Sequence, residues 1–329
     1  MNMNDWIAGY LSGSSRKPIP VLSFPGAQLI GAAVDELVRS GRRQADCMKA
    51  IAERYQTGAS LSLMDLSVEA EAFGSRISYS KEEVPTVIGA LVESLEQAEA
   101  LSVPNIGAGR TGECLRAIEY ASREITDRPV LAGIIGPFSL AGRLLDMTEI
   151  MIKCFEEPET VECVLEKATQ FLVSYAKALK AAGADGIVMA EPAAGLLSPG
   201  MLEEFSNPYV LRVKEAVEDD NFLVVYHNCG SVVPLLGSIN RLGMRAYSFG
   251  DAIDLEEALK AINPESLVFG NISPALEFRG GTPDSVGKAT RELVARCSKY
   301  PNFVLSSGCD IPPMSPLENI DAFFANAQW

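Results

Sequence analysis

The residues best suited to chemistry in this 329-residue chain are its single histidine, His227, and two of its seven cysteines, Cys229 and Cys309. The apolar run 222–226 has the length and composition of a buried strand, and it leads directly into His227 and Cys229. Residues two apart on a strand point to the same side, so both side chains can converge on one ion. A second predicted strand, residues 303–307, is followed closely by Cys309. Two strands of one parallel sheet would place three soft ligands at one sheet edge.

Histidine and cysteine are the ligand set expected for Zn²⁺, and three protein ligands with an open fourth position are typical of a catalytic zinc site. A His-x-Cys pair alone is more often part of a hydrogen-bonded core. The second strand, which ends near Cys309, brings a third potential ligand and therefore favours a metal site. Asp251 or Glu191 can fill the fourth position until substrate displaces it; otherwise water fills it and these carboxylates are rim residues. Two thiolates make zinc a poor Lewis acid for water but leave it able to hold a bound thiol as thiolate, which favours thiol alkylation.

Strands and helices are predicted to alternate along the chain. The predicted strands cover residues 21–24, 59–63, 129–135, 185–190, 222–226, 246–249, 267–269 and 303–306. The predicted helices include residues 5–12, 31–39, 47–55, 86–101, 113–125, 140–154, 158–182, 255–262 and 284–299. Eight strands alternating with helices predict an α/β fold, a (β/α)₈ TIM barrel with a short N-terminal helical extension, as one domain over residues 1–329.

Polar residues that follow the predicted strands would share the carboxyl-terminal face of this barrel, where barrel active sites lie. They are Asp65, Glu191, His227, Cys229, Asp251, Asn271 and Cys309. Four residues near strand ends are candidates for orienting a substrate: Asp65, Glu191, Tyr226 and Asn271. The glycine pattern at residues 107–112 formally fits a dinucleotide-binding motif, but no strand precedes it, so a loop leading into a helix is the better interpretation.

The composition excludes several classes of partner. Acidic residues outnumber basic ones by 43 to 28, which gives a net charge of −15 and argues against nucleic acid, since binding to phosphates relies on lysine and arginine. The longest apolar stretch, residues 130–140, is short and interrupted by glycine and proline, and the N-terminus lacks the basic region of a secretory signal. We therefore expect a soluble, cytoplasmic protein without membrane contact and with reduced cysteines.

Four stretches, at residues 64–74, 136–141, 270–274 and 306–319, make the chain resemble the uroporphyrinogen decarboxylase superfamily along nearly its whole length. Within it, His227-x-Cys229 with a distant Cys309 resembles the zinc signature of the methylcobamide:coenzyme M methyltransferases. The resemblance implies a TIM barrel that binds Zn²⁺ and transfers a methyl group from a methylated corrinoid (cobalamin), carried on a partner protein, to a zinc-bound thiol. Asp251 falls where the more distant cobalamin-independent methionine synthases have a zinc-binding carboxylate.

Some alternatives stay open at this level. The sequence does not distinguish coenzyme M from another acceptor, such as tetrahydrofolate. Decarboxylases of the superfamily have an arginine-rich N-terminal loop that binds tetrapyrrole carboxylates, whereas residues 21–38 contain no Arg or Lys. They also have a histidine near the end of the last strand, where this chain has the Cys309 region. Asp65 matches their essential aspartate and does not discriminate. A non-enzymatic alternative is a barrel with structural zinc, or a corrinoid-binding chaperone.

Overall fold

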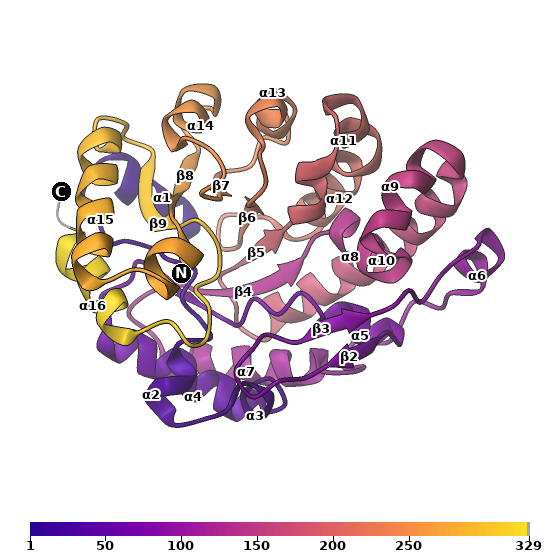
Figure 1. Cartoon of the computed structure of the whole chain (residues 1–329), viewed down its shortest axis with the longest axis horizontal. Helices are drawn as coiled ribbons and strands as arrows, with labels where there is room; N and C mark the ends of the chain where they lie inside the picture. The colour runs from indigo at the N-terminus through magenta and orange to yellow at the C-terminus, as the bar shows by residue number, and fades with distance from the viewer. Residues whose placement is uncertain (328–329) are drawn as a thin grey trace.

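A curved sheet of seven parallel strands forms the centre of the molecule, as seen in the computed structural model, which describes residues 1–327 (Figure 1). The strands follow one another in the sheet in chain order. They are β1 (Ser60–Leu61), β4 (Val130–Ile135), β5 (Gly186–Ala190), β6 (Leu223–Asn228), β7 (Ala246–Phe249), β8 (Leu267–Ile272) and β9 (Phe303–Ser307). Nearly every strand residue is buried, because the sheet is covered on both faces, and this explains why the strands are apolar runs in the sequence.

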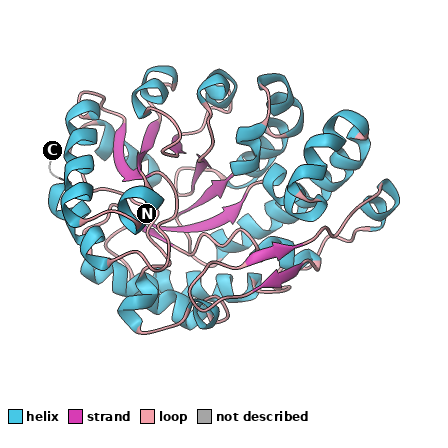
Figure 2. Ribbon diagram, in the orientation of Figure 1, coloured by secondary structure: helices cyan, strands magenta, loops and turns pink. Residues whose placement is uncertain are grey.

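Helices surround the outside of the curved sheet (Figure 2). In the first half of the chain they are α1 (Met3–Leu11), α2 (Gly26–Ile30), α3 (Val34–Leu37), α4 (Gly41–Arg54), α5 (Val68–Phe73), α6 (Leu95–Ala100), α7 (Thr111–Glu124), α8 (Pro137–Leu145), α9 (Met147–Glu156) and α10 (Pro158–Ala181). In the second half they are α11 (Pro199–Phe205), α12 (Asn207–Val217), α13 (Leu236–Asn240), α14 (Leu255–Ala261), α15 (Pro283–Cys297) and α16 (Leu317–Asn326). Short helical turns, η1 (Pro192–Leu196), η2 (Val233–Leu235) and η3 (Pro274–Arg279), follow β5, β6 and β8. The predicted TIM-barrel fold is confirmed.

The predicted strand at residues 21–24 is not a strand in the structure. An extended segment instead lies between β9 and β1: the Ile19 amide donates to the Leu305 carbonyl (2.9 Å), and the Gly58 amide donates to the Pro18 carbonyl (3.0 Å). Pro18 and Pro20 have no amide hydrogen, so they cannot sustain a regular ladder on both sides. The position of the eighth barrel strand is therefore taken by an irregular segment.

The predicted helix at residues 86–101 is wrong over its first part, residues 86–94. Residues Thr86–Ile88 form strand β3, which pairs antiparallel with β2 (Arg76–Ser78) in a hairpin outside the barrel sheet. Three consecutive β-branched residues favour a strand, and Gly89, with φ of 70°, ends it. The helix α6 begins only later, where the Ser94 hydroxyl caps the Gln97 amide.

The helix α1 covers the amino-terminal end of the strands. Its buried residues Met3, Ile7 and Tyr10 pack with interior side chains of several strands, among them Leu61 and Val225. This is the predicted N-terminal helical extension, and it plugs the end of the barrel that is opposite to the strand carboxyl ends. We call this the closed end.

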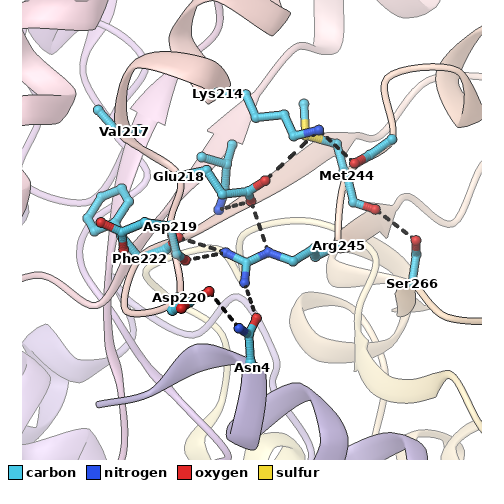
Figure 3. A network of polar contacts seen from close by, with 12 residues as sticks. Asn4, Lys214, Val217, Glu218, Asp219, Asp220, Phe222, Met244, Arg245 and Ser266 are labelled. Atoms are coloured by element: carbon cyan, nitrogen blue, oxygen red, sulfur yellow. Dashed lines mark hydrogen bonds and ion pairs between the residues drawn. The ribbon is translucent and has the colours of Figure 1, made fainter.

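A polar network fixes α1 and the closed end to each other (Figure 3). The guanidinium of Arg245, immediately before β7, donates to Asn4 of α1 (2.6 Å) and to the carbonyls of Asp219 and Phe222 (2.8 Å each). It also lies 3.4 Å from the Glu218 carboxylate. We call these contacts the Arg245 network. No helix among residues 1–327 is long and apolar enough to cross a membrane.

Candidate metal centre at the barrel mouth

His227, Cys229 and Cys309 lie together at the carboxyl-terminal end of the barrel, which we call the mouth. His227 is the penultimate residue of β6, Cys229 follows that strand, and Cys309 lies two residues after β9. Their potential ligand atoms all lie within 4.8 Å of one another. Ligand atoms of a tetrahedral zinc site with two thiolates are about 4 Å apart. The convergence predicted from two strand ends is therefore present, and we call these three residues the ligand cluster.

A hydrogen bond from the neighbouring strand orients the imidazole. His227 lies opposite Ser248 of β7 in the sheet register, and its Nδ1 is 3.0 Å from the Ser248 hydroxyl. This contact occupies Nδ1 and leaves Nε2 for a ligand, in the way that outer-shell partners fix metal-binding histidines. The His227 side chain is almost fully buried. The structure therefore restrains this ring before any ion binds.

The two sulfur atoms of the ligand cluster interact directly. A hydrogen bond with Cys309 and the nearby His227 lower the pKa of the Cys229 thiol to about 4, while the same contact raises the pKa of Cys309. Burial instead raises the pKa of Cys47 and Cys114 to about 12. Because the thiolate is the form that binds metal, the thiol of Cys229 is prepared for this role and those of Cys47 and Cys114 are not.

The ligand cluster opens into the mouth. It lines a cavity of about 50 Å³ together with Val21, Met64, Leu66, Ala190, Pro192 and Asp310. Three of those residues, Met64, Leu66 and Asp310, also line an adjoining hollow of about 340 Å³. The potential metal ligands therefore sit at the inner end of an opening large enough for a small molecule.

The sequence model of the uroporphyrinogen decarboxylase (URO-D) family matches residues 14–328 of the chain. The chain belongs to this family. Methylcobamide:CoM methyltransferase MtbA of Methanosarcina acetivorans is 29% identical over 260 residues, which are 78% of this chain and 75% of that protein. A uroporphyrinogen decarboxylase of Anaeromyxobacter sp. is 26% identical over 301 residues, 87% of this chain and 85% of that one. A solved methyltransferase structure from Methanosarcina mazei matches with a TM-score of 0.86 and 26% identity, covering 99% of this chain and 98% of that one.

The two carboxylates considered as a fourth ligand are placed differently in this URO-D family member. Asp251 is exposed and lies against Gly308, where an added Cβ would meet the Asp251 carboxylate at 2.9 Å. It is next to the ligand cluster but not part of it. Glu191 is fully buried and accepts hydrogen bonds from the Phe138 and Ser139 amides (2.8 and 2.9 Å) in the first turn of α8. The structure thus gives Glu191 a helix-capping position, and Asp251 as fourth ligand stays a prediction.

Asp65 is bound within a polar cluster of its own. It forms a buried ion pair with Arg110 and accepts hydrogen bonds from the Ser67 amide (3.0 Å) and hydroxyl (2.6 Å). Arg110 also donates to Glu71 (2.6 Å). Both oxygens of the Asp65 carboxylate are therefore already engaged by donors of the protein, and its predicted role in orienting substrate would require that this cluster rearranges or acts as a unit.

Tyr226 and Asn271 have structural partners in the same region. Tyr226 is fully buried, with its ring packed edge-on against Tyr247. The Asn271 amide donates to the Gly250 and Ile253 carbonyls (2.9 Å each) and so holds the loop that carries Asp251. Direct contact of either residue with a substrate stays a prediction.

Three residues of the mouth were missing from the sequence-based candidates. Ser248 holds His227, Asp310 lines both the small cavity and the larger hollow, and Arg143 of α8 lines the larger hollow. Asp310 follows Cys309 directly, so its position near a strand end was a usable signal. Ser248 could be found only from the register between β6 and β7, and Arg143 only from the packing of α8.

Proposed function

We propose that this protein is a zinc-dependent methyltransferase that moves a methyl group from a methylated corrinoid to a small thiol such as coenzyme M. The observation that carries the proposal is the ligand cluster: one imidazole and two sulfurs, close together, at the mouth of a URO-D family barrel. The 29% sequence identity to a methylcobamide:CoM methyltransferase supports methyl transfer from a corrinoid to a thiol. The donor set, two cysteines and a histidine whose Nδ1 is engaged, fits Zn²⁺.

A bound zinc ion would keep the sulfur of the acceptor thiol deprotonated at neutral pH, where a free thiol with a pKa near 8.5 is mostly protonated. The chain's own residues hold this arrangement: Ser248 engages Nδ1 of His227 and leaves Nε2 for the ion, and the apolar side chains of Met64 and Leu66 restrict water around the sulfur atoms. In the transfer, a carbon–sulfur bond forms to the acceptor, the cobalt–carbon bond breaks, and its electron pair stays on cobalt as Co(I). Asp251 is our proposal for the fourth ligand that the thiol displaces.

The methylated corrinoid would reach the cluster from outside, on a partner protein that docks over the mouth. Four of the large exposed apolar side chains lie in segments that follow barrel strands: Leu196, Val233, Leu276 and Met314, which are 68%, 39%, 75% and 40% exposed. Apolar side chains around an opening are typical of interaction surfaces. We propose that this apolar rim contacts the corrinoid protein.

Porphyrinogen decarboxylation is the second candidate function, because the family is described as uroporphyrinogen decarboxylase and the relative from Anaeromyxobacter sp. is named as one. A substrate with several carboxylates needs several counter-charges. Among the described residues that line the hollow of about 340 Å³, Arg143 is the one cation, while Glu83 and Asp310 contribute carboxyl groups. This lining favours a small acceptor over a polycarboxylate.

The experiment that tests the proposal is metal analysis of the purified protein together with an assay of methyl transfer from methylcobalamin to coenzyme M. Near-stoichiometric zinc and transfer that stops on chelation are the expected results. Decarboxylation of uroporphyrinogen by a metal-free protein would overturn the proposal. Zinc without transfer to any thiol would leave the site as a structural one.

A further inference from the structure

Arg143 is a cation without a counter-ion inside the barrel mouth. It lies on α8, four residues after Ser139, so the two side chains share one helix face, and both line a second hollow of about 210 Å³. Among residues 1–327, its guanidinium has no hydrogen bond or ion pair. A partly buried guanidinium with five unused donors is costly to keep without an anion.

Arg110, another arginine near the mouth, has all of its charge paired within the protein. Arg110 is paired with Asp65 and Glu71 and donates a further hydrogen bond to the Ser67 hydroxyl (2.8 Å). Its charge is therefore used inside the fold. Arg143 differs because it faces two hollows rather than partner side chains. Burial lowers the pKa of the Arg143 guanidinium, and the charge of Asp65 acts in the opposite direction.

The position of Arg143 relates it to the ligand cluster. Leu66 lines all three hollows: the cavity of the ligand cluster and the two hollows lined by Arg143. Pro192 is shared by the cluster cavity and the hollow of 210 Å³. A small molecule with its sulfur at the ligand cluster would therefore extend past Leu66 into space that Arg143 borders. Two carboxyl groups, of Glu83 and Asp310, also line the hollow of about 340 Å³. Glu83 is exposed, so solvent and salt screen it, and Asp310 already accepts a hydrogen bond from the Ser23 hydroxyl (2.9 Å).

We infer that Arg143 is a specificity-determining residue: it binds the anionic group of the acceptor and selects thiols with a negatively charged tail, such as a sulfonate or carboxylate, over neutral thiols. This inference rests on the proposed function for the sulfur end of the acceptor. The guanidinium matches the planar, multi-oxygen geometry of such anions and forms charge-assisted hydrogen bonds with them. Binding at both ends would also hold the sulfur in one position.

The test compares three probes by calorimetric titration of the zinc-loaded protein at constant ionic strength: 2-mercaptoethanesulfonate, 2-mercaptoethanol and ethanesulfonate. The wild type should bind the anionic thiol more tightly than the neutral one. Arg143→Met should weaken binding of both sulfonates by about 10- to 100-fold and leave mercaptoethanol unchanged. Arg143→Lys, which keeps the charge but not the fork of donors, should fall between the two.

Two controls keep the test independent of folding. Zinc content of each variant should match the wild type, and its melting temperature should be no lower than that of the wild type. Glu83→Gln removes the opposite charge from the same hollow and should not weaken sulfonate binding. Unchanged sulfonate binding in Arg143→Met, or an equal loss for both thiols, would overturn the role of Arg143.

The probes also separate this inference from the proposed function. If both thiols bind in a zinc-dependent way that does not depend on Arg143, the inference fails and the proposed function stands. If 2-mercaptoethanesulfonate binds no more tightly than ethanesulfonate, yet binding of both depends on Arg143, the role of Arg143 stands and the proposed function fails.

Discussion

The two ends of the barrel treat polar groups in opposite ways. At the closed end, each hydrogen-bond partner of the Arg245 guanidinium comes from the protein itself: Asn4, two backbone carbonyls and the Glu218 carboxylate (Figure 3). At the mouth, the ligand cluster and Arg143 border open space, and one oxygen of the buried Glu69 carboxylate has no hydrogen-bond partner among the described residues. Both ends are built from loops next to the same strands, so loop position alone does not explain the difference.

The difference shows where the protein stabilises itself and where it keeps binding capacity. Satisfied polar networks contribute to stability, because breaking one leaves buried groups without partners. Unsatisfied groups cost stability and persist where a ligand or an ion completes them. We therefore expect substitutions at the closed end to reduce stability, and substitutions at the mouth to change binding or to remove a cost to stability.

The largest expected effect is the loss of the metal in Cys309→Ala. Removing one of two sulfur ligands leaves a site with too few donors, so zinc content should fall to near zero and methyl transfer should stop. Metal analysis and the methylcobalamin assay measure both quantities. Cys163→Ala is the matched control, because Cys163 lies on α10 and is also partly exposed, and it should retain zinc and activity. A Cys309→Ala protein that retains zinc would contradict the proposed site.

Much of the fold was visible in the sequence for a physical reason. Strands covered on both faces are short apolar runs, and β7 was predicted at the observed residues, Ala246–Phe249. The approach of Cys309 to His227 followed from parallel topology, which brings strand carboxyl ends to one edge. The segment near Pro20 and the hairpin strand Thr86–Ile88 were misassigned, since proline and β-branched residues decided the local structure there against the wider pattern.

The internal partners of the candidate carboxylates could not be predicted. Asp65 and Glu191 both follow strands, as expected, but Arg110 and Ser139 are far from them in the sequence. Position after a strand predicts that a side chain reaches the mouth. It does not predict whether another side chain already occupies it, and this is decided by tertiary packing alone.

The second prediction concerns Glu69, the buried carboxylate at the mouth whose Oε2 has no partner among the described residues. Burial raises its pKa from 4.5 to about 7; the Ile135 amide and Arg110 act in the opposite direction, and the Asp65 charge adds to the increase. A raised carboxyl pKa means that the folded state holds the proton more tightly than the unfolded state. This contribution to stability is complete below pH 4.5 and is lost as pH rises towards 7.

Glu69→Gln stays neutral at all these pH values. At pH 5 its free energy of unfolding should be close to that of the wild type, and at pH 8 it should exceed it by up to roughly 3 kcal/mol. Urea denaturation of both proteins at pH 5, 6, 7 and 8 measures this difference in free energy of unfolding. Because the two proteins are compared at the same pH, the contributions of other titrating groups cancel, among them Glu191, whose pKa burial also raises to about 7. A constant difference across this range would show that Glu69 does not titrate between pH 5 and 8.

At the closed end, Arg245→Met should reduce the free energy of unfolding by about 2 kcal/mol, because two backbone carbonyls and the side chains of Asn4 and Glu218 each lose one of their partners. Zinc content and kcat/KM should not change below the melting temperature. Urea denaturation and the methyl-transfer assay test the two statements separately. A loss of activity without a loss of stability would break the distinction between the two ends.

The smallest expected effect distinguishes the possible fourth ligands. Asp251→Asn should lower zinc affinity by about tenfold and leave full occupancy at excess zinc, because His227 and the two cysteines supply most of the binding. Competition with a chelator of known affinity measures this change. Asp251 is exposed and lies against Gly308, so replacing its carboxylate should cost little stability. A change in zinc affinity can therefore be assigned to the lost carboxylate rather than to unfolding. An unchanged affinity would leave water in the fourth position, and the mouth would then hold zinc with the ligand cluster alone.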